Sequence, residues 1–301
     1  MKIVVSGGTG FIGGTLVQAL LKENDRVAVL TRNAKKASSN LMHYEAWNGT
    51  SQGTWSRTLD GADAVINLAG ESLAERRWTQ GQKQRIMASR IDATRALVEA
   101  IAGADKEPHT FISASAVGYY GNVGEDEVTE ESLRGEGFLA DVCERWEREA
   151  FKAEKLGCRV VVTRFGLVVE EDGGVLRKLL FPFRFFAGVV PGTGKQWVSW
   201  VHRDDVIGAI LYILNEKAIS GPVNVVAPEP VRMGELCHTL ARVLRRPCWM
   251  SVPPALIRLA LGEMGSIVLD GQKVAPKKLE GRGYRFLHPT LLPALESILK
   301  R

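Results

Sequence analysis

Residues 2–14 read KIVVSGGTGFIGG, a short apolar run that ends in a cluster of glycines. Ile12, Leu16 and Leu20 then recur at helical spacing, and a second apolar run follows at residues 27–30. This pattern predicts a strand, a tight turn, a helix and a second strand, which together make a βαβ unit. Because a crossover helix joins parallel strands, the beginning of the chain predicts a parallel sheet.

The same alternation continues along the chain. Apolar runs and helical stretches follow in turn at residues 64–68, 80–101, 110–112, 138–156 and 160–163. Beyond about residue 165 the alternation loosens, although a helix is expected at 206–214, a strand at 223–226 and a helix at 233–244. We therefore expect an α/β protein: a Rossmann-type, doubly wound parallel sheet with a smaller C-terminal substrate-side α/β lobe that ends in a helical cap.

Composition excludes several classes of protein. Hydrophobic residues make up 45% of the 301 residues and charged residues 24%, which is typical of a globular protein. The net charge of +5 is too small to indicate nucleic-acid binding, so no nucleic-acid partner is expected. No apolar stretch reaches the roughly 18 residues that span a bilayer, so no membrane partner is expected either.

The N-terminal residues and the cysteines indicate the location of the protein and whether it binds a metal. The first residues turn to glycine too soon for the apolar region of a signal peptide. The four cysteines form no C-x-x-C pair, which argues against a zinc site or a disulfide framework. The sequence therefore predicts a reduced, cytoplasmic protein without a metal.

The glycine cluster is the motif that carries chemistry. Gly7, Gly10 and Gly13 match G-x-x-G-x-x-G, and Gly8 with the last two matches G-x-G-x-x-G. Glycines allow a tight turn and a close approach of the backbone to a pyrophosphate, while the following helix N-terminus attracts phosphate. Since the motif follows a strand and opens a helix inside a βαβ unit, it predicts dinucleotide binding.

The end of the second strand indicates which dinucleotide binds. A site that prefers NAD usually carries an acidic residue there to bind the ribose 2′-hydroxyl. This chain has Thr31 and Arg32 instead, with Lys35 and Lys36 close behind. A guanidinium can pair with a 2′-phosphate, so the predicted cofactor is NADP(H). Residues 1–165 would form the NADP-binding domain, to which segments near 200–226 return, and residues 166–301 mainly the substrate-side lobe.

The run at residues 66–71 also points to the cofactor. Leu68, Ala69 and Gly70 follow a central strand, where doubly wound sheets bind ligands at the carboxyl ends of their strands. Small residues there leave room beside the backbone. Packing alone would favour alanine and glycine equally well, so the glycine motif is what favours the functional interpretation.

Several segments resemble a known family: SGGTGFIG at 6–13, NLAG at 67–70, SAS at 113–115 and WVHRDDV at 200–206. Together they resemble an extended short-chain dehydrogenase/reductase of the epimerase/dehydratase type. The segments SASAVGYYG at 113–121 and DGQKV at 270–274 are similar, more narrowly, to its atypical 39U-type branch, the epimerase family proteins. The resemblance implies further cofactor contacts at Thr9, Phe11, Ile12, Arg90, Ser113 and Arg164.

The resemblance also shows a departure from the family. Its members use Tyr-x-x-x-Lys, in which tyrosine is the acid/base and lysine holds the nicotinamide ribose. Ser115 matches the family's serine, but Leu139 falls at the tyrosine position and Cys143 at the lysine position. Leucine cannot move a proton, so another group has to do so if the protein is an enzyme.

Other residues could supply the missing proton donor. Tyr119 and Tyr120 follow the serine closely, and Glu71 or the thiol of Cys143 are alternatives. We take Ser115 and Tyr119 as the candidate catalytic residues. The alternative interpretation is that the tyrosines and the cysteine only pack inside the fold.

The C-terminal half offers candidates for substrate binding. Lys195, Arg184 and Arg203 could meet a phosphorylated substrate. His202, followed by two aspartates, is expected to form a turn into a helix with Asp204 or Asp205 as its cap, rather than a metal site. The helices at 80–101 and 138–156 could form the bundle of a homodimer.

Two hypotheses about function remain. The first is an NADP(H)-dependent oxidoreductase or epimerase acting on a small substrate, which could be a nucleotide sugar. The second is a protein that holds NADP(H) without turnover, as a regulator or redox sensor. The loss of tyrosine and lysine favours the second hypothesis, whereas Ser115 and the segment 191–197, which resembles the family's substrate loop, favour the first.

Overall fold

A central parallel sheet organises the computed structural model, which describes residues 1–34, 38–50 and 53–300. Among these residues, seven strands pair in the order β12-β7-β5-β4-β1-β2-β3. They are β1 (Lys2–Ser6), β2 (Arg26–Thr31), β3 (Met42–Ala46), β4 (Ala64–Asn67), β5 (Thr110–Ala116), β7 (Arg159–Phe165) and β12 (Gly221–Val225). Every pairing between them is parallel.

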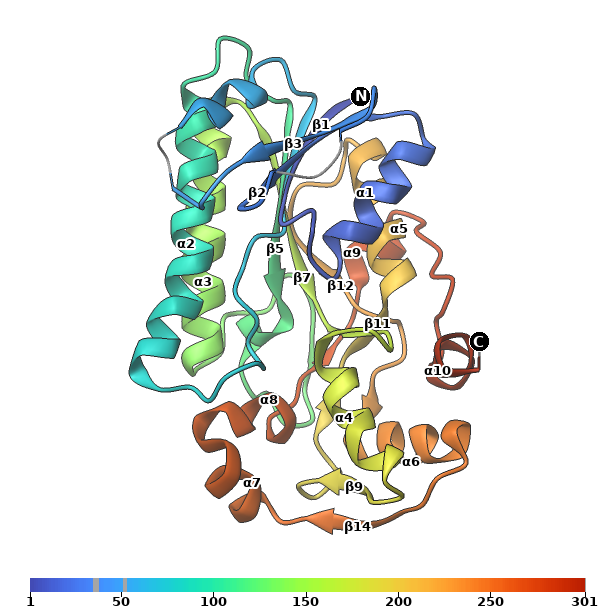
Figure 1. The fold of residues 1–301 in the computed structure, drawn as a ribbon. Helices are drawn as coiled ribbons and strands as arrows, with labels where there is room; N and C mark the ends of the chain where they lie inside the picture. Colours follow the sequence, from blue (N-terminus) through green and yellow to red (C-terminus); the bar gives the residue numbers. More distant parts are fainter. Residues whose placement is uncertain (35–37, 51–52, 301) are drawn as a thin grey trace.

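Helices cover both faces of the sheet (Figure 1). The helices α2 (Gln80–Ala102) and α3 (Phe138–Phe151) lie side by side on one face. On the other face lie α1 (Gly13–Lys22) and α5 (Arg203–Asn215). The inner strands are buried on both faces, which is why β1 reads as a continuous apolar run rather than an alternating one. The predicted doubly wound fold is confirmed.

The strand order reverses beside β1, and this reversal positions the site. β1 pairs with β2 on one side and with β4 on the other, so their crossover helices run to opposite faces. Ser6 and Asn67 are partners at the carboxyl ends of β1 and β4. In sheets of this kind, ligands bind in the crevice at such a reversal point.

The late strand is confirmed as well. β12 pairs with β7, from Gly221 opposite Val161 to Val225 opposite Phe165. The sequence did not predict β3, because this strand has no continuous apolar run. β3 pairs within the sheet with β2 alone, and all five of its residues are partly buried or exposed, as is typical of an edge strand.

The remaining elements form a smaller lobe beyond the carboxyl ends of the sheet (Figure 1). Its helices are α4 (Gly174–Arg184), α6 (Met233–Leu244), α7 (Pro254–Leu261), α8 (Ser266–Leu269) and α10 (Leu291–Leu299). The short helix α9 (Lys277–Gly281) packs against β12 of the central sheet instead. Its short strands pair as β8 (Leu167–Val169) with β11 (Trp200–His202), β9 (Gly188–Pro191) with β14 (Cys248–Val252), β10 (Trp197–Val198) with β13 (Val231–Arg232), and β6 (Glu127–Val128) with β15 (Lys273–Val274).

A core of its own holds this lobe together. Trp200, Leu236 and Leu295 are buried in a cluster that joins β11, α6 and α10. A domain boundary near residue 165 stays a prediction. No helix among the described residues combines the length and the apolar character that crossing a bilayer requires.

Candidate functional site

The glycine turn between β1 and α1 lies against the end of β4. The N–H of Gly10 donates to the carbonyl of Gly7 at 2.9 Å, and Gly7 has a φ of +71°, which glycine adopts without strain. A Cβ atom on Gly7 would lie 2.6 Å from the carbonyl oxygen of Leu68, and one on Gly13 would lie 2.2 Å from the carbonyl oxygen of Gly7. A side chain at either position would therefore push the turn away from β4.

The first turn of α1 is open to an anion. Ile12 is the N-cap residue, and no side chain accepts a hydrogen bond from the N–H groups that follow it. Thr9 and Gly10 are exposed beside these groups. Uncapped N–H groups at the positive end of a helix bind phosphate, so this turn fits the pyrophosphate of a dinucleotide.

A buried hydrogen-bond network fixes the neighbouring strand end. The hydroxyl of Ser6 donates to Oδ1 of Asn67 at 2.7 Å, and the N–H of Ala69 donates to the same oxygen at 3.2 Å. The amide of Asn67 donates to the hydroxyl of Ser113 at 3.3 Å. The structure thus brings Ser113 and the segment 68–70 together beside the glycine turn. Ser113 itself is buried under the network.

Arg32 lies where the sequence predicts the adenosine half of the cofactor. It directly follows β2 and is exposed. The hydroxyl of Thr31, the last residue of that strand, accepts a hydrogen bond from the N–H of Asn33 at 3.3 Å. The further cations expected here, Lys35 and Lys36, lie outside the described residues.

Phe11 connects the glycine turn to the smaller lobe. A Cβ atom on Gly173, just before α4, would lie 2.3 Å from the Phe11 ring. The guanidinium of Arg203 lies 5.5 Å from the centre of the same ring. The glycine turn and the beginning of α4 therefore lie against each other through the Phe11 ring.

The main cavity lies at the carboxyl ends of β5 and β7 and has a volume of about 630 Å³. Ala116 at the end of β5 and Phe165 at the end of β7 line it. Leu139, at the position that the family fills with tyrosine, lines it too. Most of its other lining side chains are apolar, among them Trp78, Val117, Phe138, Leu167, Val198 and Ile267. A cavity of this size holds a small organic molecule.

Charged groups are few in this cavity. Three carboxylates and one guanidinium line it: Glu136, Glu263, Asp270 and Arg258. Lys83 pairs with Glu263. Burial raises the pKa of Asp270, and the nearby charge of Arg258 opposes that rise. Asp270 is therefore a carboxyl group whose acid form persists to higher pH than usual.

Sequence reasoning did not assign Asp270 a role. It lies in the segment 270–274, which contributes to the family resemblance. Asp270 is about 155 residues from Ser115 in the sequence, so no local pattern reveals that it lies beside the cavity. The absence of a tyrosine at Leu139 is the signal that could have indicated another proton donor.

The two candidate catalytic residues belong to a buried network instead of the cavity lining. Ser115 is 3% exposed, and its hydroxyl donates to Glu147 at 2.7 Å. Arg164 donates to both oxygens of Glu147, at 2.9 and 2.7 Å, and to the hydroxyl of Tyr120 at 2.9 Å. The ring of Tyr119 stacks on the Arg164 guanidinium, with 3.5 Å between its centre and Cζ.

This network also bears on the alternative donors. Tyr120 is fully buried, and burial raises its pKa to about 12. Glu71 accepts a hydrogen bond from Gln82 at 2.8 Å and does not line the cavity. Phe165 and Gly166 line the cavity next to Arg164, whose own guanidinium faces the network; its cofactor contact stays a prediction.

Cys143 and Arg90 are neighbours at the position that the family gives to lysine. Burial, with a contribution from Glu147, raises the pKa of Cys143 to about 11, so the thiol stays protonated at neutral pH. The Arg90 charge acts on this thiol and on Glu71. A Cβ atom on Gly70 would lie 3.2 Å from Cζ of Arg90, which places the guanidinium beside the cofactor segment.

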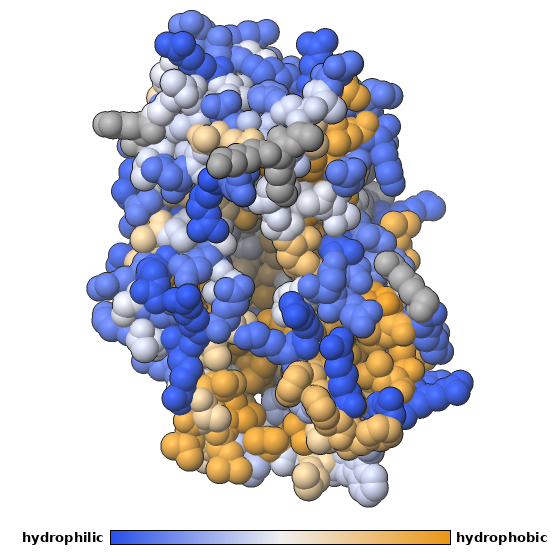
Figure 2. Space-filling view, viewed as in Figure 1, coloured by the Kyte–Doolittle hydropathy of each residue, from blue (hydrophilic) through white to orange (hydrophobic). Residues whose placement is uncertain are grey.

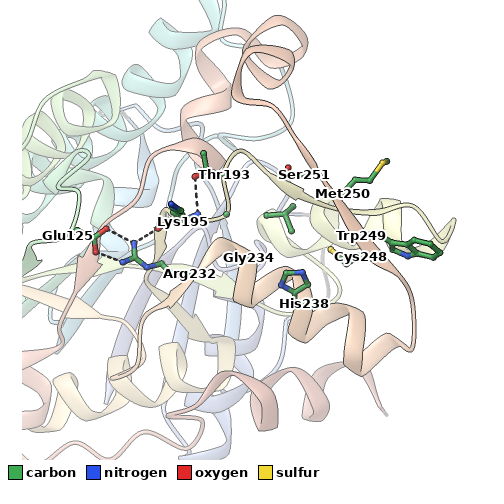
Figure 3. Close-up of a pocket in the computed structure, with 12 residues that line it drawn as sticks. Glu125, Thr193, Lys195, Arg232, Gly234, His238, Cys248, Trp249, Met250 and Ser251 are labelled. Atoms are coloured by element: carbon green, nitrogen blue, oxygen red, sulfur yellow. Dashed lines mark hydrogen bonds and ion pairs between the residues drawn. The ribbon is translucent and has the colours of Figure 1, made fainter.

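The cations expected to meet a phosphorylated substrate lie elsewhere. Arg203 pairs with Glu170 at 3.0 Å, and Arg184 lies 3.7 Å from Glu171. Lys195 lines a second cavity, of about 450 Å³, together with Arg232 (Figure 3). None of these three cations lines the main cavity.

Figure 3 shows how that second cavity is closed off on one side. Arg232 forms an ion pair with Glu125 and donates to the backbone carbonyl of Lys195. Its guanidinium also stacks on Trp197, 3.7 Å from the ring centre, and Trp197 lines the main cavity. The stacked pair therefore separates the two cavities.

One expectation about the start of α5 is wrong. The N-cap of this helix is His202, whose Nδ1 accepts the N–H of Asp204 at 3.0 Å. Asp205 accepts hydrogen bonds from the N–H groups of Leu287 at 2.6 Å and His288 at 2.9 Å. Asp204 therefore supplies the N–H group that His202 caps. Asp205 instead holds the distant segment at Leu287 and His288.

Ligand atoms of His202, Asp204 and His288 lie within 4.8 Å of one another. The two imidazole rings stack with 3.8 Å between their centres. The cap bond uses Nδ1 of His202, and Nε2 of the same ring lies 3.5 Å from the hydroxyl oxygen of Ser297. The expectation that this group holds no metal stays a prediction.

Comparisons with known proteins agree with this architecture. The model of the NAD-dependent epimerase/dehydratase family matches residues 3–226, and a second model, described as a domain of unknown function, matches residues 252–298. An epimerase family protein of Staphylococcus saprophyticus is 42% identical over 298 residues, 98% of each chain. The epimerase family protein YfhF of Bacillus subtilis is 40% identical over 301 residues, 99% of this chain and 98% of that one.

Solved structures are similar along the whole chain. The human epimerase family protein SDR39U1 (isoform 2), solved with NADPH, has a TM-score of 0.88 and 29% identity, and all of both chains is covered. A nucleoside-diphosphate sugar epimerase from Corynebacterium glutamicum has a TM-score of 0.80 and 30% identity, over 99% of this chain and 58% of that one. These matches confirm the resemblance that the sequence motifs carried.

Proposed function

Because this chain belongs to the NAD-dependent epimerase/dehydratase family, we propose that it binds NADP(H) and transfers hydride between the nicotinamide and a small, largely apolar carbonyl or alcohol. Two features of the structure together support this proposal. The open, uncapped glycine turn lies at the reversal point of the sheet, and an apolar cavity of about 630 Å³ lies at the ends of β5 and β7.

The residues present fit the cofactor. The turn at Gly7 and the uncapped start of α1 would hold the pyrophosphate, and Arg32 would pair with the 2′-phosphate. Arg90 lies beside Cys143 and Gly70, where it would hold the ribose in place of the family's lysine. Bound there, NADP(H) would supply or accept the hydride. The NADPH in the human relative supports the choice of phosphate form.

The cavity favours an uncharged substrate over a nucleotide sugar. A nucleoside diphosphate brings at least two negative charges, whereas the lining holds three carboxylates and one guanidinium. Leu139 and Val198 line the cavity with apolar surface and offer neither a proton donor nor a cation. A small ketone, aldehyde or quinone fits these walls better.

Asp270 is the proton-transferring group that we propose. It lines the cavity, its pKa is raised by burial, and a neutral carboxyl can donate a proton to the oxygen of a carbonyl as hydride arrives at the carbon. Ser115 and Tyr119 would instead position the wall of the cavity through Glu147 and Arg164. None of the four cysteines forms a disulfide, which supports a reducing, cytoplasmic setting.

A screen of NADPH oxidation against ketones, aldehydes, quinones and nucleotide sugars tests this function. Turnover of an uncharged carbonyl is expected, and Asp270→Asn should lower kcat about 10²-fold or more. Ser115→Ala and Tyr119→Phe should each retain most of the activity. A large loss in either of these variants with full activity in Asp270→Asn would contradict the assignment.

The alternative is a protein that holds NADP(H) without turnover. The missing tyrosine at Leu139 is the specific observation that favours it. NADPH binding together with an absence of oxidation across the whole screen would support this alternative over the enzyme.

A further inference from the structure

The exposed hydrophobic side chains gather at one end of the molecule. Of the ten large hydrophobic residues that are exposed among the described residues, seven come from three neighbouring segments of the smaller lobe. They are Phe181, Phe185 and Phe186 in and after α4, Trp249 and Met250 in β14, and Leu256 and Leu259 in α7. We call these seven residues the end face. Figure 2 shows hydrophobic residues concentrated at this end of the surface.

These segments form one continuous surface. β14 pairs with β9, and an apolar groove of about 290 Å³ runs between α4, β9, β14 and α7. Leu179, Val252 and Leu261 line this groove. It shares Val175 and Ile267 with the main cavity, so the groove leads from the end face toward the substrate cavity.

The exposure is large for the residue types involved. Trp249 is 83% exposed and Leu259 is 77% exposed. Isolated hydrophobic residues are normal on a surface, but a contiguous patch marks an interaction site. Aromatic side chains in particular favour the boundary between water and lipid.

The charges around the end face are cationic. The stretches 173–203 and 236–262, which contain all seven residues, hold no aspartate or glutamate. Lys178, Arg184 and Arg245 are exposed beside the hydrophobic residues. The guanidinium of Arg246 stacks on Phe186, 3.8 Å from the ring centre. Of these cations, Arg184 lies near a carboxylate, 3.7 Å from Glu171.

The cations around the end face, which we call the cationic rim, indicate whether a second copy of the chain or a lipid surface binds there. A second copy of the chain, docked by two-fold symmetry, would bring the rim against itself and place like charges together. An anionic lipid surface instead accepts both the hydrophobic residues and the cations. We propose that the end face docks the protein on the surface of anionic membranes.

This docking differs from the membrane contact that the sequence excluded. That expectation rested on the absence of a spanning stretch, and surface docking needs none. The end face is assembled from three segments that together extend over about 80 residues of sequence, so no single stretch reveals it. The proposal also does not depend on the chemistry in the cavity.

Co-sedimentation of the whole protein with vesicles tests the proposal. The vesicles are phosphatidylcholine alone, or phosphatidylcholine mixed with phosphatidylglycerol. Binding to the mixed vesicles is expected to exceed binding to the neutral ones by about tenfold at low salt and to weaken as salt is added. Phe185→Ser with Trp249→Ser tests the hydrophobic part, and Lys178→Glu with Arg245→Glu tests the charged part.

Matched changes elsewhere serve as controls. Leu133→Ser removes an 89% exposed leucine outside the end face, and Lys22→Glu reverses a charge on α1. Both end-face variants should lose at least about fivefold in binding, with unchanged melting temperatures, while both controls bind like the original protein. Equal binding to both kinds of vesicle, no binding to either, or equal losses in the controls would overturn the proposal. The proposal would also be overturned if the original protein were a dimer and the variant with Phe185→Ser and Trp249→Ser were a monomer.

Discussion

Glu147 on α3 and Arg164 on β7 form a bidentate ion pair that water does not reach, with N–O distances of 2.9 and 2.7 Å. Their side chains are 5% and 3% exposed. Ser115 and Tyr120 complete the hydrogen bonding of the pair. This network fixes the end of β5 against α3 beside the cavity. It lies near the positions where the family has its catalytic tyrosine and lysine.

We predict that Glu147→Gln strongly destabilises the fold. Removing one charge of a buried pair leaves the other uncompensated, which costs about 3 kcal/mol or more. Chemical denaturation measures the free energy of unfolding. Glu144→Gln on the same helix is the control, because Glu144 pairs with Arg148 at the surface, where the expected loss is about 0.5 kcal/mol. A loss below about 1 kcal/mol for Glu147→Gln would contradict the structural role of the pair.

The rate of carbonyl reduction is predicted to depend on Asp270. Burial raises the pKa of this carboxyl group, so its acid form persists to higher pH than that of an ordinary aspartate. Reduction consumes a proton from the acid form. The value of kcat/KM should therefore fall as pH rises through the pKa of Asp270, and oxidation in the reverse direction should rise.

A pH profile of NADPH oxidation measures whether kcat/KM falls as pH rises. Asp270→Asn cannot ionise, and its residual activity should show no such limb. An identical limb in both proteins would assign the titration to another group.

The four cysteines are predicted to react at very different rates with a thiol reagent. Burial raises the pKa of Cys143 to about 11, that of Cys158 to about 11 and that of Cys237 to about 12. Cys248 is the least buried and lines the second cavity (Figure 3). Because the thiolate is the reacting form, Cys248 should react first in the native protein.

Absorbance from a disulfide reagent follows this reaction. Cys248→Ser should remove the fast phase, and the other three thiols should appear only when the protein is unfolded. Early reaction of Cys143 would show that the lysine position is open to solvent.

The sequence predicted the sheet well, because strands buried on both faces leave long apolar runs, as in Ile3 to Val5. It missed β3, whose residues at the sheet edge are all partly buried or exposed and form no apolar run. It also assigned the glycine turn and residues 68–70 to one ligand, and the structure places Gly7 against Leu68 at the reversal point of the sheet.

The interior of the site was harder to predict. Ser115 matches the family's serine in sequence, yet its hydroxyl is used by Glu147, a pairing across 32 residues that no local pattern records. Asp270 reaches the cavity from the C-terminal lobe. His202 caps α5 in place of an aspartate, because its Nδ1 accepts the N–H that an aspartate would otherwise take.

The proposed function requires that the chain holds NADP(H) across the glycine turn, with Arg32 on the 2′-phosphate. Calorimetric titration of the protein with NADPH and with NADH tests it most directly. NADPH should bind about tenfold more tightly than NADH, since a charge-paired phosphate contributes about 1.4 kcal/mol. Arg32→Glu should abolish this preference, while Arg90→Gln should weaken both cofactors alike. No binding of either dinucleotide, or equal losses of both in Arg32→Glu, would contradict the account.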